Sequence, residues 1–114
     1  MNKSFFVVII MLAMACSKKQ TETPPGVLGK EDIVRVLIDV HLLEAKVKKL
    51  YLNRDSSEVV FAHYEQMLFD DMGITKADYE RSMEYYTDNI QQMKSIYDEV
   101  VDSLLARQKA QDFE

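Results

Sequence analysis

Cysteine and long apolar runs are scarce in this chain of 114 residues. It has one cysteine, Cys16, so no disulfide can form within it. No segment has the roughly 20 consecutive apolar residues that a membrane-spanning helix needs. No stretch alternates between apolar and polar residues as a strand does, and no internal repeat is evident. Helix packing, or a partner, must therefore stabilise the one small domain that this length allows.

The N-terminal segment has the features of an export signal. Lys3 precedes residues 5–14, which are apolar and carry no charge. This run is about half as long as a membrane-spanning helix, and it matches the hydrophobic region of a secretory signal peptide. We therefore expect residues 1–15 to be a signal peptide that directs the chain to the cell envelope.

Cys16 stands where this apolar run ends, and two kinds of cleavage compete there. Residues 13–15, Ala-Met-Ala, form an ordinary small-x-small site, whose use would leave Cys16 as a free thiol. Residues 12–16 resemble a lipobox, with Leu12 one position further from the cysteine than usual. A free thiol is a liability in an oxidising envelope, so we expect Cys16 to be lipidated. Two or three acyl chains would then anchor the protein to a membrane.

The net charge of −5 is unevenly distributed along the chain. Residues 17–54 contain eight basic and five acidic side chains, whereas residues 55–114 contain five basic and fourteen acidic ones. One interpretation is that the basic half meets anionic lipid headgroups. We favour the simpler one, in which the halves attract each other or face solvent. The acidic balance, without a basic stripe interleaved with aromatics, argues against nucleic acid as a partner.

Helical periodicity predicts an all-α fold for residues 30–114, a small bundle of three to four amphipathic helices. Residues 16–29, with Pro24, Pro25 and Gly26, predict a flexible tether before it. The first helix is expected over about residues 30–53, the second after an N-cap at Ser56, and the fourth after Asp88 or Asn89. The side chains expected to face the core are Ile33, Leu37, Val40, Val47, Tyr51, Val60, Phe61, Tyr64, Met67, Leu68, Met72, Tyr79, Met83, Tyr86, Ile90, Met93, Tyr97, Val100, Val101 and Leu104.

Residues 73–78, Gly-Ile-Thr-Lys-Ala-Asp, give the clearest local signal. Gly73 suits the left-handed residue that follows a helix, and Ile74 can fold back onto the last turn. Thr75 and Asp78 have the spacing of a capping box. The segment therefore predicts a tight corner between the second helix and a short third one.

His41 and Glu44 are a candidate polar pair in the first helix. They share one helix face, and Glu44 falls inside the apolar sector, whereas Asp39 points about 140° away from it. A metal site would need further ligands from another helix, and His63, the second histidine, falls towards the polar side of its own helix. Catalysis would need a nucleophile and a water-excluding cleft. We predict neither, and instead expect a buried pair that hydrogen-bonds internally and to Tyr79, Tyr86 or Tyr97.

Tyrosines and methionines recur at the expected inward positions, among them Tyr64, Met67, Tyr79 and Met83. Core packing is the favoured interpretation, because side chains at helical spacing usually form the core. The alternative is a soft, adaptable groove for a partner helix or peptide.

Several segments together resemble a known family. They are residues 38–45 (Ile-Asp-Val-His-Leu-Leu-Glu-Ala), the corner at 73–75 and residues 85–86 (Tyr-Tyr), with the cysteine-ended signal and the proline-containing tether. The chain is similar to small envelope lipoproteins of Bacteroidota that are defined by a domain of unknown function (DUF4296). The resemblance covers nearly the whole mature chain and implies a helical fold, but no activity and no site residues. Surface-displayed lipoproteins of these bacteria tend to have acidic residues after the cysteine, so Lys18 and Lys19 favour an outer-membrane location facing the periplasm.

These observations favour a non-enzymatic accessory lipoprotein that binds another envelope protein and needs no cofactor. The alternative is a small metal-binding, ligand-binding or hydrolytic protein that uses His41 and Glu44.

Overall fold

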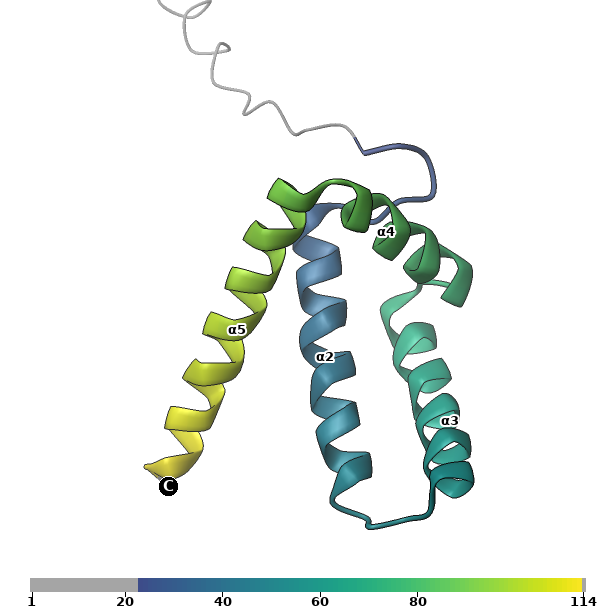
Figure 1. The fold of residues 1–114 in the computed structure, drawn as a ribbon, viewed down its shortest axis with the longest axis vertical. Coiled ribbons are helices and arrows are strands. Elements are labelled where there is room, and N and C mark those ends of the chain that lie inside the picture. The colour runs from purple at the N-terminus through teal and green to yellow at the C-terminus, as the bar shows by residue number, and fades with distance from the viewer. Residues whose placement is uncertain (1–22, 114) are drawn as a thin grey trace, which may run out of the picture.

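The computed structural model describes residues 23–113, which form four helices in chain order: α2 (Lys30–Lys48), α3 (Arg54–Met72), α4 (Lys76–Asp88) and α5 (Ile90–Asp112). Helix α2 lies between α3 and α5 and packs on both of them, and α4 crosses one end of the molecule (Figure 1). No helix within these residues is long and apolar enough to cross a membrane. The predicted all-α bundle is confirmed. The predicted signal peptide, Cys16 and residues 16–22 lie outside the described residues.

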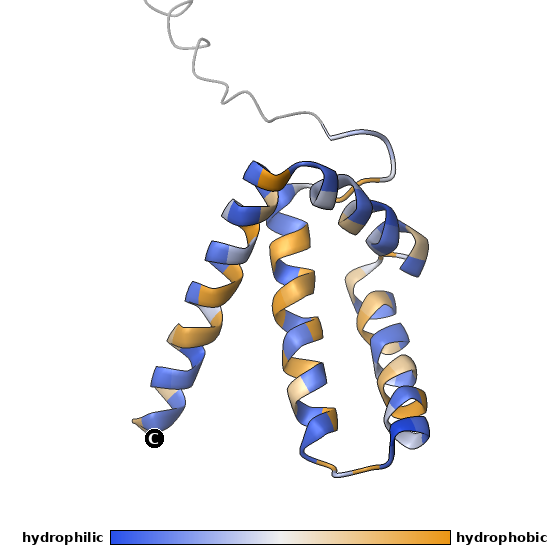
Figure 2. Ribbon diagram, viewed as in Figure 1, coloured by the Kyte–Doolittle hydropathy of each residue, from blue (hydrophilic) through white to orange (hydrophobic). Residues whose placement is uncertain are grey.

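Helix α2 is central because its apolar residues pack on two of its sides. Figure 2 shows in orange how many hydrophobic residues α2 contains. One side packs with α4 and α5 in a cluster of buried residues: Ile33, Val34, Leu37, Ile38, Tyr86, Ile96 and Val100. A second side packs against α3, where Val36 and Val40 contact Phe69. An element that is apolar on two sides can bury itself against two neighbours, which explains its middle position.

The turn between α2 and α3 differs from the prediction at both helix ends. Helix α2 ends at Lys48, not near Asn53, and Tyr51 adopts a left-handed backbone with φ of 51°. Helix α3 begins at Arg54, because the Asn53 side chain accepts a hydrogen bond of 2.8 Å from the Ser56 backbone N–H. Asn53 is therefore the N-cap, and Ser56 lies inside the first turn.

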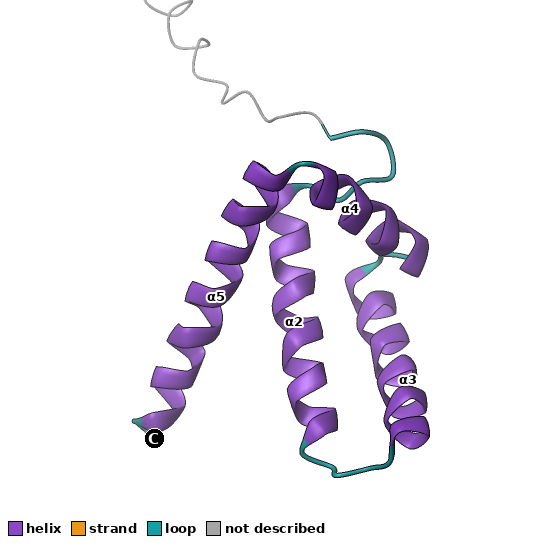
Figure 3. Cartoon of the chain, viewed as in Figure 1, coloured by secondary structure: helices purple, strands orange, loops and turns teal. Residues whose placement is uncertain are grey.

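The predicted corner between α3 and α4 is confirmed. Gly73 has φ of 68°, its N–H donates to the carbonyl of Asp70, and the Ile74 N–H donates to the carbonyl of Phe69. Thr75 and Asp78 exchange the two hydrogen bonds of a capping box. The loop between α3 and α4 is short (Figure 3), so α4 turns directly back towards the N-terminal end of α2.

Asn89 separates α4 from α5, in agreement with the expected boundary, but its side chain does not cap α5. Its Nδ2 atom instead donates to the carbonyl of Tyr85 at 2.6 Å. The amide therefore satisfies a carbonyl at the end of α4.

Residues 23–29, which the sequence predicts to be part of a tether, pack against α4. The Leu28 N–H donates to Ser82 Oγ at 2.8 Å, and the Tyr86 hydroxyl donates to the Leu28 carbonyl at 2.7 Å. Ser82 is fully buried, and Val27 and Leu28 pack against the α2–α4–α5 cluster. The folded unit therefore begins before Lys30, because the extended backbone here finds hydrogen-bond partners that no periodicity reveals.

The predicted core is wrong at several positions. Five side chains expected to face inward are exposed: Tyr51, Tyr64, Met67, Ile90 and Val101. Phe69, Ile96, Ser82 and Glu65 are buried, although none of them was expected to be. Helix α3 is the clearest case, because it packs mainly along one line against α2 and buries only Glu65 and Phe69.

Candidate functional site

His41 and Glu44 contact each other as predicted, but they are not buried. His41 Nδ1 lies 3.2 Å from Glu44 Oε2, and 34 % and 49 % of the two side chains are exposed. Glu44 belongs to the apolar sector of α2 by angle, yet it comes late in the helix, where α5 has diverged from α2 (Figure 1). The helices that would cover it are too far apart there, so the prediction of a buried pair is wrong.

Polar and aromatic groups surround this pair beneath α4. The His41 and Tyr97 rings lie 6.1 Å apart between centroids. Tyr79 packs on Phe69, and its pKa is raised above the ordinary value of 10.0 by burial, then by Glu65, Tyr97 and Glu44. A tyrosine whose ionised form is disfavoured is a poor general base. Tyr79 is therefore suited to packing between helices rather than to acting as a general base.

Glu65 is the one largely buried carboxylate among residues 23–113. Its side chain is 11 % exposed, and Lys76 Nζ lies 3.5 Å from its Oε1 atom. This ion pair joins the middle of α3 to the start of α4 and compensates for the burial of the charge. Within the described residues, no three His, Cys, Asp or Glu side chains are arranged to hold a metal ion. His63 is exposed and packs edge-on against Tyr64.

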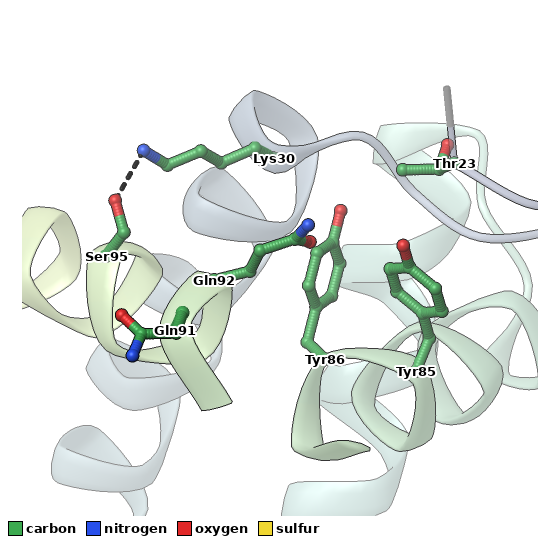
Figure 4. A pocket seen from close by; sticks show the side chains of 7 residues that line it. All are labelled: Thr23, Lys30, Tyr85, Tyr86, Gln91, Gln92 and Ser95. Atoms are coloured by element: carbon green, nitrogen blue, oxygen red, sulfur yellow. Dashed lines mark hydrogen bonds between the residues drawn. The ribbon is translucent and has the colours of Figure 1, made fainter. Parts of the chain in front are cut away.

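The first of two hollows lies where residue 23, the start of α2, the end of α4 and the start of α5 meet (Figure 4). It has a volume of about 250 Å³ and is lined by Thr23, Lys30, Tyr85, Tyr86, Gln91, Gln92 and Ser95. Lys30 Nζ donates to Ser95 Oγ at 2.7 Å and also lies 2.7 Å from a carboxylate oxygen of Glu99. A lysine activates a serine only when it is desolvated and neutral. Solvent and Glu99 both stabilise the Lys30 ammonium, so this arrangement is an ion-pair network.

The second hollow is a groove between α2 and α3, with a volume of about 280 Å³. We call it the α2–α3 groove. It is lined by Asp39, Leu42, Leu43 and Lys46 from α2 and by Tyr64, Met67, Leu68 and Asp71 from α3. On each helix these positions follow the i, i+3, i+4, i+7 spacing of a single face. Two such faces side by side form the seam on which a third helix packs.

The α2–α3 groove is apolar along its middle and charged at its ends. Helices α2 and α3 run antiparallel (Figure 1), so their sequence order puts Asp39 and Asp71 towards one end of the groove and Lys46 towards the other. Asp39 Oδ1 also lies 3.9 Å from Nη1 of Arg107 in α5. Tyr64 and Met67 are about half exposed on its wall. The prediction that these two side chains pack in the core is therefore wrong, and the weaker alternative of a soft groove fits their positions.

Sequence reasoning identified Tyr64, Met67 and Leu68 as one face of a helix, but missed Leu42 and Leu43 of the facing helix. Their signal was present, since Asp39, Leu42, Leu43 and Lys46 share the same spacing. An apolar face, however, does not reveal whether a neighbour covers it.

A comparison of the sequence with models of protein families assigns the chain to a family. The model described as a domain of unknown function (DUF4296) matches residues 24–110. The chain belongs to the DUF4296 family. The matched region begins four residues before Leu28, which contacts α4, and it ends near the end of α5. It therefore coincides with the packed helical unit. No curated protein and no solved structure matches the chain.

Proposed function

We propose that this DUF4296 protein is a lipid-anchored, non-enzymatic accessory protein of the bacterial cell envelope. Its domain would face the periplasm from the outer membrane, held there by acyl chains on Cys16. In this proposal the domain binds an amphipathic helix of another envelope protein in the α2–α3 groove. The observation that carries the proposal is the open seam between α2 and α3.

The α2–α3 groove defines the chemistry of the partner helix. Its middle, with Leu43 and Met67, takes apolar side chains spaced three and four residues apart, as grooves that bind helices do. Met67 is flexible and polarisable, and so adapts to the shape of what it contacts. Asp39 already pairs with Arg107 of α5 at 3.9 Å, so Asp71 is the acidic side chain of this end that favours the N-terminus or a basic side chain of the bound helix. At the other end, Lys46 favours the C-terminus or an acidic side chain.

The anchor has separate support from the sequence. The only cysteine stands at the end of a short apolar run and resembles the cysteine of a lipobox. Such an anchor would keep the domain near a membrane without inserting any of its helices. A small domain held in this way meets membrane-associated partners at a raised effective concentration.

Site-specific photocrosslinking in living cells tests this proposal. A photoreactive amino acid replaces Met67 in the full chain, and in a matched control it replaces Val59, which is exposed on the same helix but lies outside the groove. We expect one discrete heterologous product at position 67, and mass spectrometry should identify the captured segment as an amphipathic helix. Adding Leu43→Asp, on the opposite wall, should abolish that product.

Three results would contradict the proposal. They are no product at position 67, the same products at positions 67 and 59, or a product that consists of two copies of this chain. A product that survives Leu43→Asp would also count against the groove, because a charge on its wall must weaken apolar docking.

A further inference from the structure

The turn between α2 and α3 forms an exposed tip at the end of the molecule far from α4 (Figure 1). We define the cationic tip as Lys48, Lys49, Leu50, Tyr51, Leu52 and Arg54. Lys46 lies two residues before it, and the acidic side chains nearest in sequence after it are Asp55 and Glu58. Arg54 pairs with Glu58 across one helical turn, at 3.0 Å from Nε to Oε1. Cations outnumber acids here, although the whole chain has a net charge of −5.

Three consecutive apolar side chains lie at the apex of this tip and are directed to solvent. Leu50 is 55 % exposed, Tyr51 94 % and Leu52 40 %. Single exposed apolar residues are ordinary on protein surfaces, but a continuous group flanked by charges marks a surface that meets another apolar phase.

The backbone at Tyr51 supports this interpretation. Its φ of 51° is a left-handed conformation that residues with a Cβ rarely adopt, and glycine or asparagine is the usual residue at such a helix end. The Tyr51 backbone N–H donates to the Lys48 carbonyl at 3.2 Å, so the left-handed residue helps to end α2. The same turn directs the Tyr51 side chain, 94 % exposed, into solvent at the apex.

We propose that the cationic tip binds an anionic lipid surface. Leu50, Tyr51 and Leu52 enter the headgroup region, and Lys48 and Lys49 contact lipid phosphates around them. Lysines near an anionic membrane attract it electrostatically, and their long alkyl stems allow the charge to stay at the headgroup level. Tyrosine is enriched at membrane interfaces because one end of its side chain is apolar and the other is polar.

The shape of the tip favours a membrane over a protein. The tip is a turn at the end of a helix pair, and neither of the two hollows described above includes any of its six residues. An apolar apex with cations on both sides of it in the sequence fits a broad, yielding, negatively charged surface. This contact is distinct from the α2–α3 groove, so either proposal can fail without the other.

The chain contains no tryptophan, which makes a direct test possible. Tyr51→Trp places a single fluorescent reporter at the apex, and Ile90→Trp places one at an exposed apolar position at the α4 end of α5. Both are made in the full chain, so any attachment through the N-terminal segment is common to the two. Vesicles of phosphatidylglycerol and phosphatidylethanolamine are compared with vesicles of phosphatidylcholine, and circular dichroism verifies that each variant keeps its helices.

We expect the emission of the indole at position 51 to shift to the blue and to be quenched by brominated lipids on the anionic vesicles alone, with no change at position 90. In the Tyr51→Trp chain, each of Lys48→Gln and Lys49→Gln should weaken this response about fivefold, and added salt should weaken it further. An unshifted, unquenched indole at position 51 on anionic vesicles overturns the proposal, and is also what a tip that binds an acidic protein would give. Equal responses at positions 51 and 90, or a response unaffected by the lysine substitutions, overturn it as well.

Discussion

Individual side chains in this protein take their roles from what surrounds them more than from their type. Tyr86 is buried and joins residues 23–29 to α4 through one hydroxyl, whereas Tyr51, the same residue type, is solvent-exposed at a turn. His41 and Glu44 are residue types that often bind metals or transfer protons, but both side chains are partly exposed to solvent. An exposed pair of this kind stabilises a fold very little.

Substitution of Cys16 tests the anchor. Cys16→Ala removes the sulfur that acyl chains would occupy, so we expect a soluble protein, or an unprocessed precursor, in place of a membrane-attached one. Fractionation of cells into membrane and soluble parts, with the mass of the product measured, distinguishes these outcomes. Membrane attachment of a Cys16→Ala chain that has lost its signal peptide would refute the anchor. Cys16→Ser keeps the size of the side chain but lacks the thiol, so it should behave as Cys16→Ala does.

Double substitution of His41 and Glu44 tests the structural interpretation of the pair. We expect His41→Ala with Glu44→Ala to lower the free energy of unfolding by at most about 1 kcal/mol, because the side chains are solvated. Urea denaturation followed by circular dichroism measures this value. Metal content of the purified protein is measured in parallel, and a stoichiometric metal that disappears in the double variant while the helices persist would support the metal-binding alternative.

The helices are delimited by short signals that act locally. The corner at 73–78 contains a left-handed glycine, a fold-back hydrogen bond from Ile74 and a reciprocal capping box, all within six residues. Interactions of this range do not depend on the rest of the fold, so the sequence pattern identifies them directly. At the start of α3, the Asn53 side chain is the N-cap, and the Ser56 backbone N–H donates a hydrogen bond to it.

Gly73→Ala tests the corner. A Cβ at Gly73 would meet no atom within 4 Å, so any penalty comes from the backbone φ of 68° and not from a clash. We expect a loss of about 1 kcal/mol in the free energy of unfolding, measured by urea denaturation. Gly73→Asn is the matched control, because asparagine tolerates the left-handed conformation better than alanine does, and it should cost less than Gly73→Ala. Equal effects of the two substitutions would contradict this account.

The molecule as a whole is a layer of three helices joined at one end by α4, with α2 in the middle (Figure 1). The end of the molecule near α4 is well packed around Tyr86, Ile96 and Val100. Towards the opposite end, α5 diverges from α2 (Figure 1). This arrangement separates three features in space: residues 23–29 against α4, the α2–α3 groove along the side, and the cationic tip at the far end.

Two tyrosines of α4, Tyr79 and Tyr86, predict a loss of stability at alkaline pH. Burial raises the pKa of Tyr79 and of Tyr86 above 10.0, with further contributions from Glu65 and Tyr85 respectively. The unfolded chain releases these phenol protons near pH 10, whereas the folded chain retains them to higher pH. The free energy of unfolding is therefore unaffected below about pH 10 and falls as the pH rises from there through the raised values.

Urea denaturation at about pH 8 and about pH 11 measures this effect. Tyr79→Phe with Tyr86→Phe should reduce the loss between the two pH values, even though the substitutions lower stability at both. Tyr51→Phe, at an exposed tyrosine, should leave the loss unchanged. An identical loss in the double variant and in the unsubstituted chain would contradict the assignment to these two residues.

The sequence by itself determined the features that depend on near neighbours in the chain. Periodicity identified an all-helical body, the corner at 73–78 was predicted correctly in its details, and His41 and Glu44 were correctly placed in contact. The family resemblance agrees with the match over residues 24–110. Each of these depends on residues within about one helical turn of each other, or on motifs, which a sequence displays directly.

Only the tertiary structure decided which apolar and polar faces are covered. Leu28 is held by Ser82 and Tyr86, more than fifty positions away, so residues 23–29 belong to the folded unit and not to a tether. Tyr64 and Met67 stay half exposed because α3 contacts α2 along a single line, and Glu44 stays exposed because α5 diverges. A periodic stripe indicates that a face can be buried, but whether a neighbour lies over it depends on how distant helices cross.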